Sequence, residues 1–534
     1  MTSERTGFGA RFHPRIWMAA DKTPWTDRWS RALFEFSKSA TSRQLLVAVP
    51  IVLGLTYFYA FLASAGTFRM IPSRPDYYDR MCEGFRAGHL YILEQPKPEL
   101  LAKPNPYADE NFFQNLWLWD ASLYKGRYYL YWGPVPALLL WLWKVLTGYV
   151  GTVSDQWGTV CYMTGRLVFG TGLILGLAKY MKARPPTWLV ALCVAVFGLT
   201  SPIPFIVARP DIYEASLAAG QCFMFAGWWF AFLGLVQERR RSSWFVLAST
   251  ACALAFGSRV TTAIASPFIL GATLFFVWYK LERSLAKCFR FALALGGPFG
   301  LGCVAIASYN YLRFDSPFEF GIRFQVTLQH FTRHDVYVIP NLFSYLFAPL
   351  KWSCAFPFVA GQKFRPLTTL ITWPPGYLTF EVAGGVLVMG GFLWLQFAHL
   401  YWGARALVRR FAKWAFPPVM CVSWIHLWAI ICSIGAILSL WPALGLWESS
   451  MRYSGDAVGG MAILASIAAF WLVRRGDESA WFRGWSKAIV VVLGLHSCLV
   501  GGLVGFTSYD EPFRHYNPAL LAKLVETFSI CDWF

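Results

Sequence analysis

Two aspartates, Asp76 and Asp79, follow the first long apolar run and carry side chains suited to acid–base chemistry. They stand near the start of a polar, aromatic stretch, residues 74–136, that is rich in carboxylates and arginines. A carboxylate at the edge of an apolar environment is partly desolvated, which raises its pKa toward that of a general base. The alternative is that they are solvated loop acids paired with Arg74 or Arg80. We take the pair as candidate acid–base residues.

A second group of acids, Asp211 and Glu214, lies in a gap of only a few residues between two apolar runs. So short a gap holds both side chains against the ends of the neighbouring segments. They could bind a metal, orient an acceptor molecule or cap the next helix, whose dipole favours an acid in its first turn. Capping alone explains Asp211 more readily than it explains Glu214.

Arginines near the ends of apolar runs form a third group: Arg166, Arg259, Arg313, Arg323 and Arg452. A charge at membrane depth is usually paired or functional, and Arg binds phosphate in a bidentate manner. Anchoring at the interface by snorkelling is the alternative. Arg259 and Arg452 are the better candidates for an anion site because each is the only basic residue in a tight turn.

The composition predicts the kind of protein that holds these residues in position. The chain has 534 residues, 56% of them hydrophobic and 14% charged, which is typical of a polytopic membrane protein. We expect about eleven transmembrane helices, which makes this an all-α polytopic membrane protein with interfacial helices. The expected spans are residues 45–63, 160–179, 187–208, 214–236, 244–257, 260–279, 291–309, 381–403, 418–441, 458–473 and 486–506.

The net charge of +18 is a topology signal, because Lys and Arg gather in alternate gaps between apolar runs. It therefore does not indicate a nucleic-acid partner. The positive-inside rule places the N-terminus in the cytoplasm, with an uncleaved first anchor, and residues 66–158 and about 310–380 outside. Residues 133–147 are short for a span and interrupted by Lys144, so we expect an interfacial helix there.

This topology divides the chain into a cytoplasmic N-terminal segment (1–43), a transmembrane catalytic module (44–309), a second external loop (310–380) and C-terminal helices with an external tail (381–534). The catalytic module includes the first external loop, residues 66–158. The twelve cysteines do not form a metal-binding pattern. Cys82, Cys354 and Cys531 are expected outside, where one disulfide can form, although the sequence does not assign it.

Several short motifs, in their order and on their expected membrane side, resemble the GT-C superfamily of membrane glycosyltransferases. The likeness is to the branch with protein O-mannosyltransferases and lipid A aminoarabinose transferases. The matching features are Asp76 with the tyrosine-rich stretch to Tyr91, Gly133 to Pro136, Arg166, Asp211, Ser258-Arg259 and Arg452-Tyr453. The family commonly has Asp-Glu at the first site, whereas Tyr77 follows Asp76 here.

The resemblance implies inverting transfer of a sugar from a polyprenyl-phosphate carrier to an acceptor hydroxyl of a glycan, lipid or protein. Asp76 would be the general base, and Arg259 or Arg452 would bind the carrier phosphate. The second acid or acceptor-binding residue would be Asp79, Asp120, Asp211 or Glu214, and Tyr77, Tyr78 and Trp132 would stack on sugars. The expected location is the periplasmic face of a bacterial inner membrane. The resemblance does not settle whether a cofactor takes part, and a divalent cation such as Mg²⁺ or Mn²⁺ is the candidate.

A transporter or flippase of lipid-linked sugars would share the hydrophobicity and the arginines. It would, however, place acids at mid-membrane, whereas here they stand at the expected outer face. A membrane acyltransferase would need a histidine on its reaction path. His399, His426 and His496 lie in apolar runs and are explained more simply as interior residues.

Overall fold

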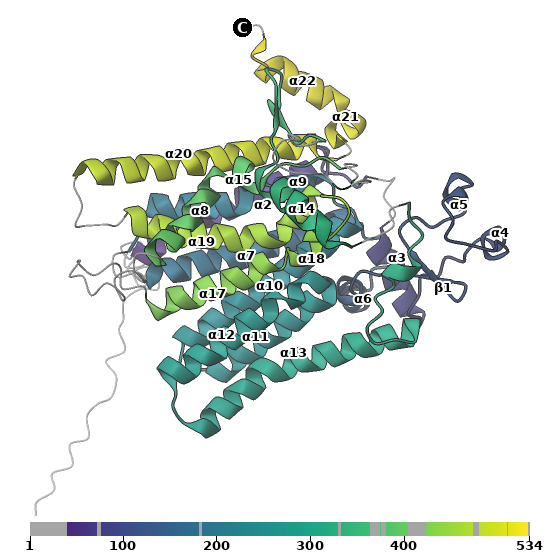
Figure 1. Cartoon of the computed structure of the whole chain (residues 1–534), viewed down its shortest axis with the longest axis horizontal. Helices are drawn as coiled ribbons and strands as arrows, with labels where there is room; N and C mark the ends of the chain where they lie inside the picture. Colours follow the sequence, from purple (N-terminus) through teal and green to yellow (C-terminus); the bar gives the residue numbers. More distant parts are fainter. Residues whose placement is uncertain are drawn as a thin grey trace, which may run out of the picture.

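The computed structural model of the protein describes residues 40–71, 76–180, 184–328, 333–363, 374, 377, 381–403, 423–473, 480–509 and 511–531. These residues form a bundle of long, roughly parallel helices with a smaller group of short elements at one end (Figure 1). We call that end the loop end. Arg74, the expected basic gap at 405–413 and almost all of the expected segment 1–43 lie outside the described residues.

Eight helices in the described part of the chain are long and apolar enough to cross a membrane. They are built from α2 (Ala40–Ala63), α7 (Asp155–Lys179), α10 (Ile212–Val236), α12 (Ala265–Phe276) with its flanking turns, α13 (Leu285–Phe314), α17 (Trp424–Leu438), α19 (Gly455–Val473) and α20 (Ala480–Val504). The fold class expected from the sequence, an all-α polytopic membrane protein, is confirmed.

The other three expected spans are helical but differ from the eight in length or polarity. Residues 187–208 form two helices, α8 (Thr187–Leu199) and α9 (Ile203–Ala208), separated at Pro202, which lacks the N–H needed to continue a helix. Residues 381–403 form short pieces, among them α15 (Val386–Met389) and η5 (Gly391–Phe397). The third segment, α11 (Arg241–Ser258), is less apolar and packs between α10 and α13.

The centre of the bundle is α19, in which 89% of the most apolar window is buried, whereas the figure for the peripheral α13 is 17%. Arg166 lies inside the bundle on α7 and is fully buried. Its guanidinium donates to the carbonyl of Phe197, 3.1 Å away in the last turn of α8, and stacks on the Phe197 ring. The last carbonyls of a helix lack helical partners, so Arg166 satisfies a helix end within the bundle.

The loop end carries the first expected external loop. Its elements are α3 (Tyr77–Arg86), α4 (Pro98–Leu101), α5 (Glu110–Phe113), β1 (Ser122–Tyr124), β2 (Arg127–Tyr129) and α6 (Val135–Thr147). The expected helix at 133–147 is therefore present as α6, which is too short to span. The buried Lys144 of α6 lies 2.7 Å from Asp79 and 2.8 Å from Glu83, both on α3. These two ion pairs clip α6 to α3.

The second expected external loop continues this group of elements. It contains η3 (Ile322–Phe324), η4 (Asp335–Tyr337), α14 (Val338–Phe347), β3 (Lys351–Trp352) and β4 (Val359–Ala360). The backbone N–H of Asp120 donates to Val326 at 3.1 Å, and the Val326 N–H donates to Ala121 at 2.9 Å. The two loops are thus joined by backbone hydrogen bonds, and Val326 and Leu328 of the second loop pack into the aromatic cluster of the first.

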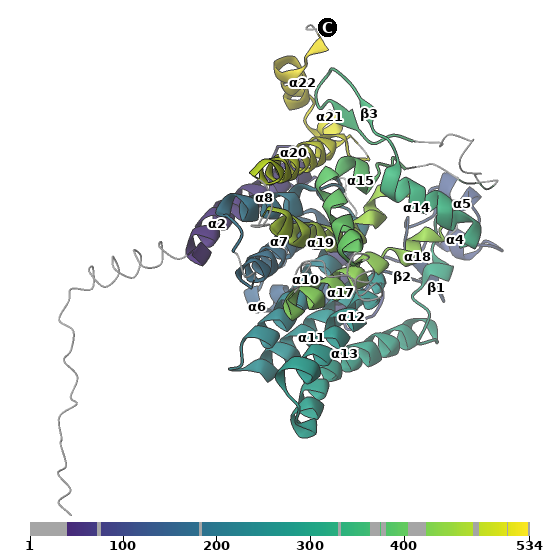
Figure 2. The ribbon, with the colours of Figure 1, turned by 60° about the vertical axis from the view of Figure 1, so that its left-hand side comes forward.

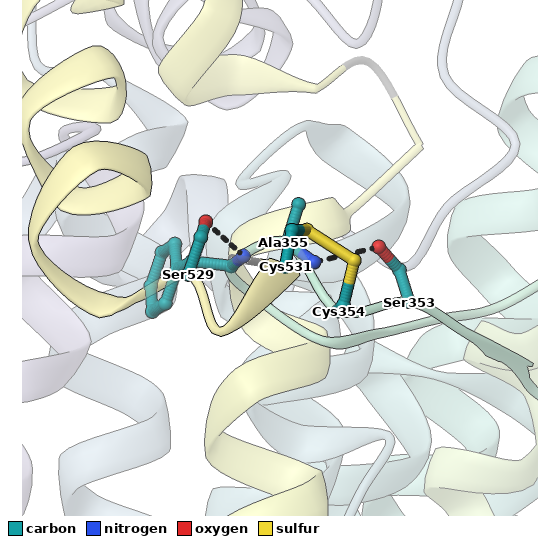
Figure 3. Close-up of a disulfide and its surroundings, with 6 residues drawn as sticks. Ser353, Cys354, Ala355, Ser529 and Cys531 are labelled. Carbon is teal, nitrogen blue, oxygen red and sulfur yellow. Dashed lines mark hydrogen bonds between the residues drawn. A yellow bond between two sulfur atoms is a disulfide. The ribbon is translucent and has the colours of Figure 1, made fainter. Parts of the chain in front are cut away.

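The C-terminal residues form α21 (Pro512–Tyr516) and α22 (Pro518–Phe528), which project from the bundle beside β3 (Figure 2). Cys531 forms a disulfide with Cys354, next to β3 (Figure 3). Around it, the N–H of Ile530 donates to Cys354 and the N–H of Phe356 donates to the Ser529 hydroxyl, at 2.9 and 3.0 Å. The pairing that the sequence left open is therefore settled, and Cys82 is a buried free cysteine.

Candidate functional site

Asp76 directly precedes α3 and reaches the first turn of α7. Its Oδ1 atom accepts hydrogen bonds from the Ser154 hydroxyl at 2.7 Å and from the Asp155 N–H at 3.1 Å. The carboxylate of Asp155 in turn hydrogen-bonds the backbone N–H of Tyr78 at the start of α3. Each acid thus lies at the N-terminal end of the other's helix, where backbone N–H groups are available to its carboxylate. Two carboxylates are therefore brought together where the bundle meets the first loop.

The other candidate acid on α3, Asp79, has a structural role. Besides the ion pair with Lys144, its Oδ1 accepts a hydrogen bond from the N–H of Val153 at 2.9 Å. The side chain is only 9% exposed, and its carboxylate is occupied by these two structural interactions. The structure does not bring Asp79 to a cavity, and we no longer consider it a second acid.

Asp120 is buried, with a left-handed backbone conformation, φ 62°. Its carboxylate accepts hydrogen bonds from the Tyr213 hydroxyl and from the Gln325 amide, the latter at 2.9 Å. Burial raises the pKa of Asp120, while these two hydrogen bonds and the nearby Arg452 oppose the rise. Asp120 therefore joins the first loop, the second loop and α10, and it fixes the hydroxyl of Tyr213.

Glu214 and Arg452 belong to one buried cluster of charges. Arg452 lies 3.0 Å from Glu381 and 3.9 Å from Glu214, while Arg209 lies 3.8 Å from the same Glu214 oxygen. The guanidinium of Arg452 also stacks on the Tyr213 ring, 4.2 Å from its centre. Arg452 is 3% exposed and is already neutralised by carboxylates. Arg452 is also not among the residues that line the cavity described below, whereas Arg259 is.

Arg259 follows α11 and forms the strongest ion pair of the site. Its Nε lies 2.8 and 2.9 Å from the two carboxylate oxygens of Asp456, and its Nη2 lies 2.8 Å from Oδ2. The hydroxyl of Thr261 donates to the same Oδ2 at 3.0 Å. Asp456 thus clamps one edge of the guanidinium, and the Arg259 side chain lines the cavity described next.

A cavity of about 250 Å³ lies at the loop end, between the first loop and the helix ends. Its walls are mainly aromatic side chains and small hydroxyl residues. The lining consists of Tyr131, Trp132, Gly133, Tyr213, Ser216, Ser258, Arg259, Val260, Thr261, Phe320, Ile322, Pro442, Ala443, Leu446 and Tyr453. Tyr78, two residues after Asp76, lies beside Ser216 and close to Arg259. This contact places the start of α3 next to the cavity wall.

A second, larger hollow of about 490 Å³ is an apolar groove between the first loop and α11 and α13. It is lined by Phe85, Gly88, His89, Leu90, Pro134, Val135, Leu138, Trp141, Ala253, Leu254, Gly257, Gly302, Ala305, Ile306 and Tyr309. A side chain at Gly133 would come within 2.0 Å of the Gly257 carbonyl. Gly257 lines the groove and Gly133 lines the cavity, and their backbones are in close contact. A single layer of backbone therefore separates the groove from the cavity.

The three residues expected to stack on sugars differ in position. Trp132 lines the cavity. Tyr77 and Tyr78 are 3% and 4% exposed, and the Tyr77 hydroxyl donates to the Trp119 carbonyl inside the first loop. Neither is among the residues that line the cavity, and both pack into the hydrophobic cluster of the loop. The cavity is instead lined by Tyr131, Tyr213 and Tyr453, for which the sequence did not predict sugar stacking.

The residues of this site do not fit a bound divalent cation. Among the side chains that the structure describes, no three of His, Cys, Asp or Glu form a group that could hold a metal ion. Asp76 is engaged with the start of α7, and Glu214 with two arginines. The cation that the sequence left open therefore finds no ligand set here.

Four acids that the sequence analysis missed complete the site: Asp155, Glu381, Glu448 and Asp456. The sequence does contain a local signal for Asp155, because Ser154-Asp155 directly before an apolar run is typical of a helix N-terminus. Asp456 is an acid within an otherwise apolar segment, which usually marks a functional or paired residue. Its pairing with Arg259, 197 residues earlier, has no local signal.

Comparison with known proteins gives matches among solved structures but none by sequence. The sequence matches no known family model and no curated relative. An oligosaccharyltransferase of Archaeoglobus fulgidus has a similar structure at 12% identity and a TM-score of 0.48, covering 86% of this chain and 56% of that one. ArnT from Cupriavidus metallidurans, solved with undecaprenyl phosphate, is similar at 13% identity and a TM-score of 0.38, covering 90% and 77%.

Both structures are GT-C glycosyltransferases, the superfamily that the sequence motifs resemble. The chain spans little more than half the length of the oligosaccharyltransferase. With TM-scores below 0.5, these likenesses carry no argument about what this chain does. A function for this chain therefore has to be argued from its own cavity, groove and charged residues.

Proposed function

We propose that this protein transfers a sugar from a polyprenyl-phosphate carrier to an acceptor hydroxyl at the periplasmic face of a bacterial inner membrane. The observation that carries the proposal is the arrangement of two hollows around Gly133 and Gly257. One is an apolar groove beside the membrane-crossing helices α11 and α13, and the other is an aromatic, hydroxyl-lined cavity. A lipid-linked sugar has the same two parts in the same order.

In this proposal the isoprenoid chain lies in the groove, where only apolar side chains and His89 meet it. The sugar lies in the cavity, and the phosphate lies between them at Arg259. The helix that continues into α12 begins directly after Arg259, and its first N–H groups add partial positive charge. Arg259, rather than Arg452, is therefore the proposed phosphate-binding residue.

The chemical step is an inverting displacement at the anomeric carbon. The acceptor oxygen forms a bond to C1 as the bond from C1 to the phosphate oxygen breaks. Asp76 takes the acceptor proton, and the electron pair leaves with the carrier phosphate, whose charge Arg259 stabilises. A positioned base contributes about 10² to 10⁴-fold, and preorganised charge on the leaving group about 3 to 4 kcal/mol. Asp155 holds Asp76 in position, because its backbone N–H donates to the Asp76 carboxylate and its own carboxylate binds the N–H of Tyr78 at the start of α3.

The disulfide supports the membrane side in this proposal. Cys354 belongs to the second expected external loop and Cys531 to the expected external tail, and structural disulfides persist in oxidising compartments such as the periplasm. The proposed domain division keeps residues 44–309 as the catalytic module. Contacts of the site reach beyond this module. Asp120 binds Gln325 and Arg259 binds Asp456, and the pair of Arg452 with Glu381 lies wholly outside residues 44–309.

The test is transfer of radiolabelled sugar from polyprenyl-phosphate donors to a membrane extract, using the purified protein in one detergent. Asp76→Asn is expected to lose about 10² to 10⁴-fold in rate while keeping its melting temperature. Glu110→Gln, an exposed acid of α5, is the matched control and should transfer normally. Undiminished transfer by Asp76→Asn would remove Asp76 as the base. Absence of transfer, with movement of the lipid-linked sugar across liposomes, would make the protein a flippase.

A further inference from the structure

We infer that α22, together with the β3–β4 hairpin that the disulfide joins to it, lies on the membrane surface at the loop end and binds anionic phospholipid there. We call α21, α22 and this hairpin (residues 351–360) the C-terminal unit. Its attachment to lipid is independent of the proposed sugar transfer.

The C-terminal unit begins where two membrane-crossing helices end. The Asn517 side chain, at the start of α22, donates to the carbonyl of Ala65 at 2.9 Å, just beyond the end of α2. A Cβ atom at Gly66 would come within 2.6 Å of Leu520, so the first turn of α22 lies directly against this end of α2. α21 follows shortly after the apolar span that contains α20. The start of α22 is therefore level with the boundary of the membrane.

From this point α22 leaves the bundle sideways. Figure 1 shows it beyond α20, at the edge of the bundle and at an angle to the long helices, and Figure 2 shows it outside the bundle from a second direction. None of its 11 residues is buried. A helix that projects sideways where the spans end has lipid headgroups beside it rather than the protein core. This is the position of an interfacial helix.

One face of α22 is apolar. Its large apolar residues recur at the spacing of a single helix face: Leu520, Leu521, Leu524, Val525 and Phe528. The polar Lys523, Glu526 and Thr527 lie on the opposite side. The first two leucines pack against the core of the bundle, whereas Phe528 is 53% exposed. An apolar face that ends in an exposed ring suits insertion between headgroups and acyl chains.

The exposed apolar surface is continuous with that of the spanning helices. Tyr57 of α2 is 64% exposed, and its ring centre lies 5.1 Å from that of Phe68. The ring of Phe68 meets that of Phe61 at 6.2 Å, and Phe61 meets Phe513 of α21 at 5.5 Å. Trp352 of β3, 61% exposed, is of the residue type enriched at membrane interfaces. The C-terminal unit thus extends the lipid-facing surface of the bundle.

The helix and the hairpin are held together as one unit. The disulfide joins Cys354 to Cys531, beyond the end of α22. The ring of Phe356 lies 5.0 Å from Phe506, at the end of α20, and 6.0 Å from Phe528. A unit that is already ordered loses little conformational entropy when it contacts the membrane.

The charges of the C-terminal unit favour anionic lipid. Arg514 neutralises Glu511, 2.5 Å away. The other Lys, Arg, Asp and Glu side chains among the described residues of the unit are Lys351, Lys523 and Glu526, which leaves an excess of positive charge. Basic side chains beside an amphipathic helix attract anionic headgroups. The binding partner is therefore assigned as an anionic phospholipid.

Photo-cross-linking of the full-length protein tests this assignment. The cross-linking amino acid p-benzoylphenylalanine replaces either Phe528 on the apolar face or Glu526 on the polar face, which serves as the matched control. Each protein is reconstituted into vesicles of phosphatidylcholine and phosphatidylglycerol in equal amounts, and mass spectrometry measures the phospholipid adducts. We expect at least about 10-fold more adduct at position 528, because only the apolar face enters the bilayer.

The headgroup preference is read from the same adducts. The phosphatidylglycerol adduct at position 528 should exceed the phosphatidylcholine adduct by roughly 2- to 5-fold. Lys351→Gln combined with Lys523→Gln should abolish this preference and keep the adduct itself, since both lysines are exposed and the apolar face is unchanged.

Hydrogen exchange of the unmodified protein guards against loss of folding in the variants. The amides of residues 518–528 should exchange roughly 3-fold more slowly in vesicles that contain phosphatidylglycerol than in phosphatidylcholine alone, whereas those of α4 and α5 should not change. Equal exchange in the two vesicles, or a headgroup preference that survives the double lysine substitution, would overturn the assignment to anionic lipid. Equal lipid adducts at 526 and 528, no lipid adduct, or cross-linking of position 528 to protein, including a second copy of this chain, would overturn the membrane contact itself.

Discussion

At the scale of single residues, the arginines of this site are defined by carboxylates far away in the sequence. Asp456 clamps one edge of Arg259, and Glu381 with Glu214 neutralises Arg452. An Arg held in a bidentate contact cannot be replaced by Lys without loss of geometry. The orientation of Arg259, and with it the proposed phosphate contact, therefore depends on Asp456.

Replacing Asp456 by Asn should reduce both stability and transfer. The change leaves the buried guanidinium of Arg259 without its counter-charge, and breaking a buried ion pair typically costs about 3 to 5 kcal/mol. Thermal unfolding in detergent and the transfer rate measure the two effects. Thr261→Val, which removes one hydrogen bond to the same carboxylate, should cost only about 1 kcal/mol. Equal effects of the two variants would contradict the clamp.

Glu448 gives a prediction for pH. Burial, together with the neighbouring Glu381 carboxylate, raises the pKa of Glu448 from 4.5 to about 7, although Arg452 opposes the rise. The folded state therefore holds this proton more tightly than the unfolded state, and it loses stability as the pH rises from about 4.5 to 7.

Glu448→Gln removes this dependence and should be more stable than the wild type at pH 8, by up to about 3 kcal/mol. The advantage should shrink as the pH falls toward 5. Melting curves of both proteins over this range test it, with Glu526→Gln on the exposed α22 as control. A difference in melting temperature that does not change with pH would show that the proton on Glu448 is not involved.

At the scale of elements, the α3–α6 pair forms part of the wall of the apolar groove. Phe85 of α3 and Leu138 and Trp141 of α6 line the groove. The ion pairs of Lys144 with Asp79 and Glu83 hold the two helices together. The shape of the groove should therefore depend on this clip.

Lys144→Met tests the clip, because it keeps the stem of the side chain and removes the charge. It leaves the buried Asp79 carboxylate without its counter-charge, so we expect a loss of about 3 to 5 kcal/mol. Asp79→Asn added to Lys144→Met should recover part of that loss, since the unpaired charge is gone. Hydrogen exchange of residues 77–86 and 135–147, with thermal unfolding, provides the readout. Additive effects of the two substitutions would contradict a direct ion pair.

The sequence predicted elements better than contacts. Hydropathy found the long helices, and the single Lys144 in an apolar run of 15 residues correctly indicated a helix too short to span, α6. The break at Pro202 was overlooked because the apolar character continues on both sides of it. Asp76, Arg259 and Trp132 were singled out by residue type, position and family resemblance, and their roles stay predictions. The role of Asp79 in the clip, the pairing of Asp456 with Arg259 and the Cys354–Cys531 bond depend on tertiary packing, which no local pattern encodes.

At the scale of the whole molecule, the proposed topology makes a prediction about the two ends of the chain. It adds α8–α9, α11 and α15–η5 as three crossings to the eight long helices of the described residues, which gives an odd number of passes. In this proposal the two ends of the chain lie on opposite sides of the membrane. The proposed periplasmic side of the Cys354–Cys531 disulfide and the proposed cytoplasmic side of the basic N-terminal residues agree with that arrangement.

Epitope tags at both ends of the full chain test this topology in spheroplasts. Added protease should remove the C-terminal tag and spare the N-terminal one, because only the former is outside. A maleimide polymer should modify Cys354 and Cys531 only after reduction, whereas Cys354→Ser should expose Cys531 without reduction. Loss of the bond should also lower the melting temperature, since a disulfide typically contributes about 2 to 4 kcal/mol. Both tags on one side, or Cys531 reactive in the unreduced wild type, would contradict the eleven-pass arrangement and the periplasmic cavity that follows from it.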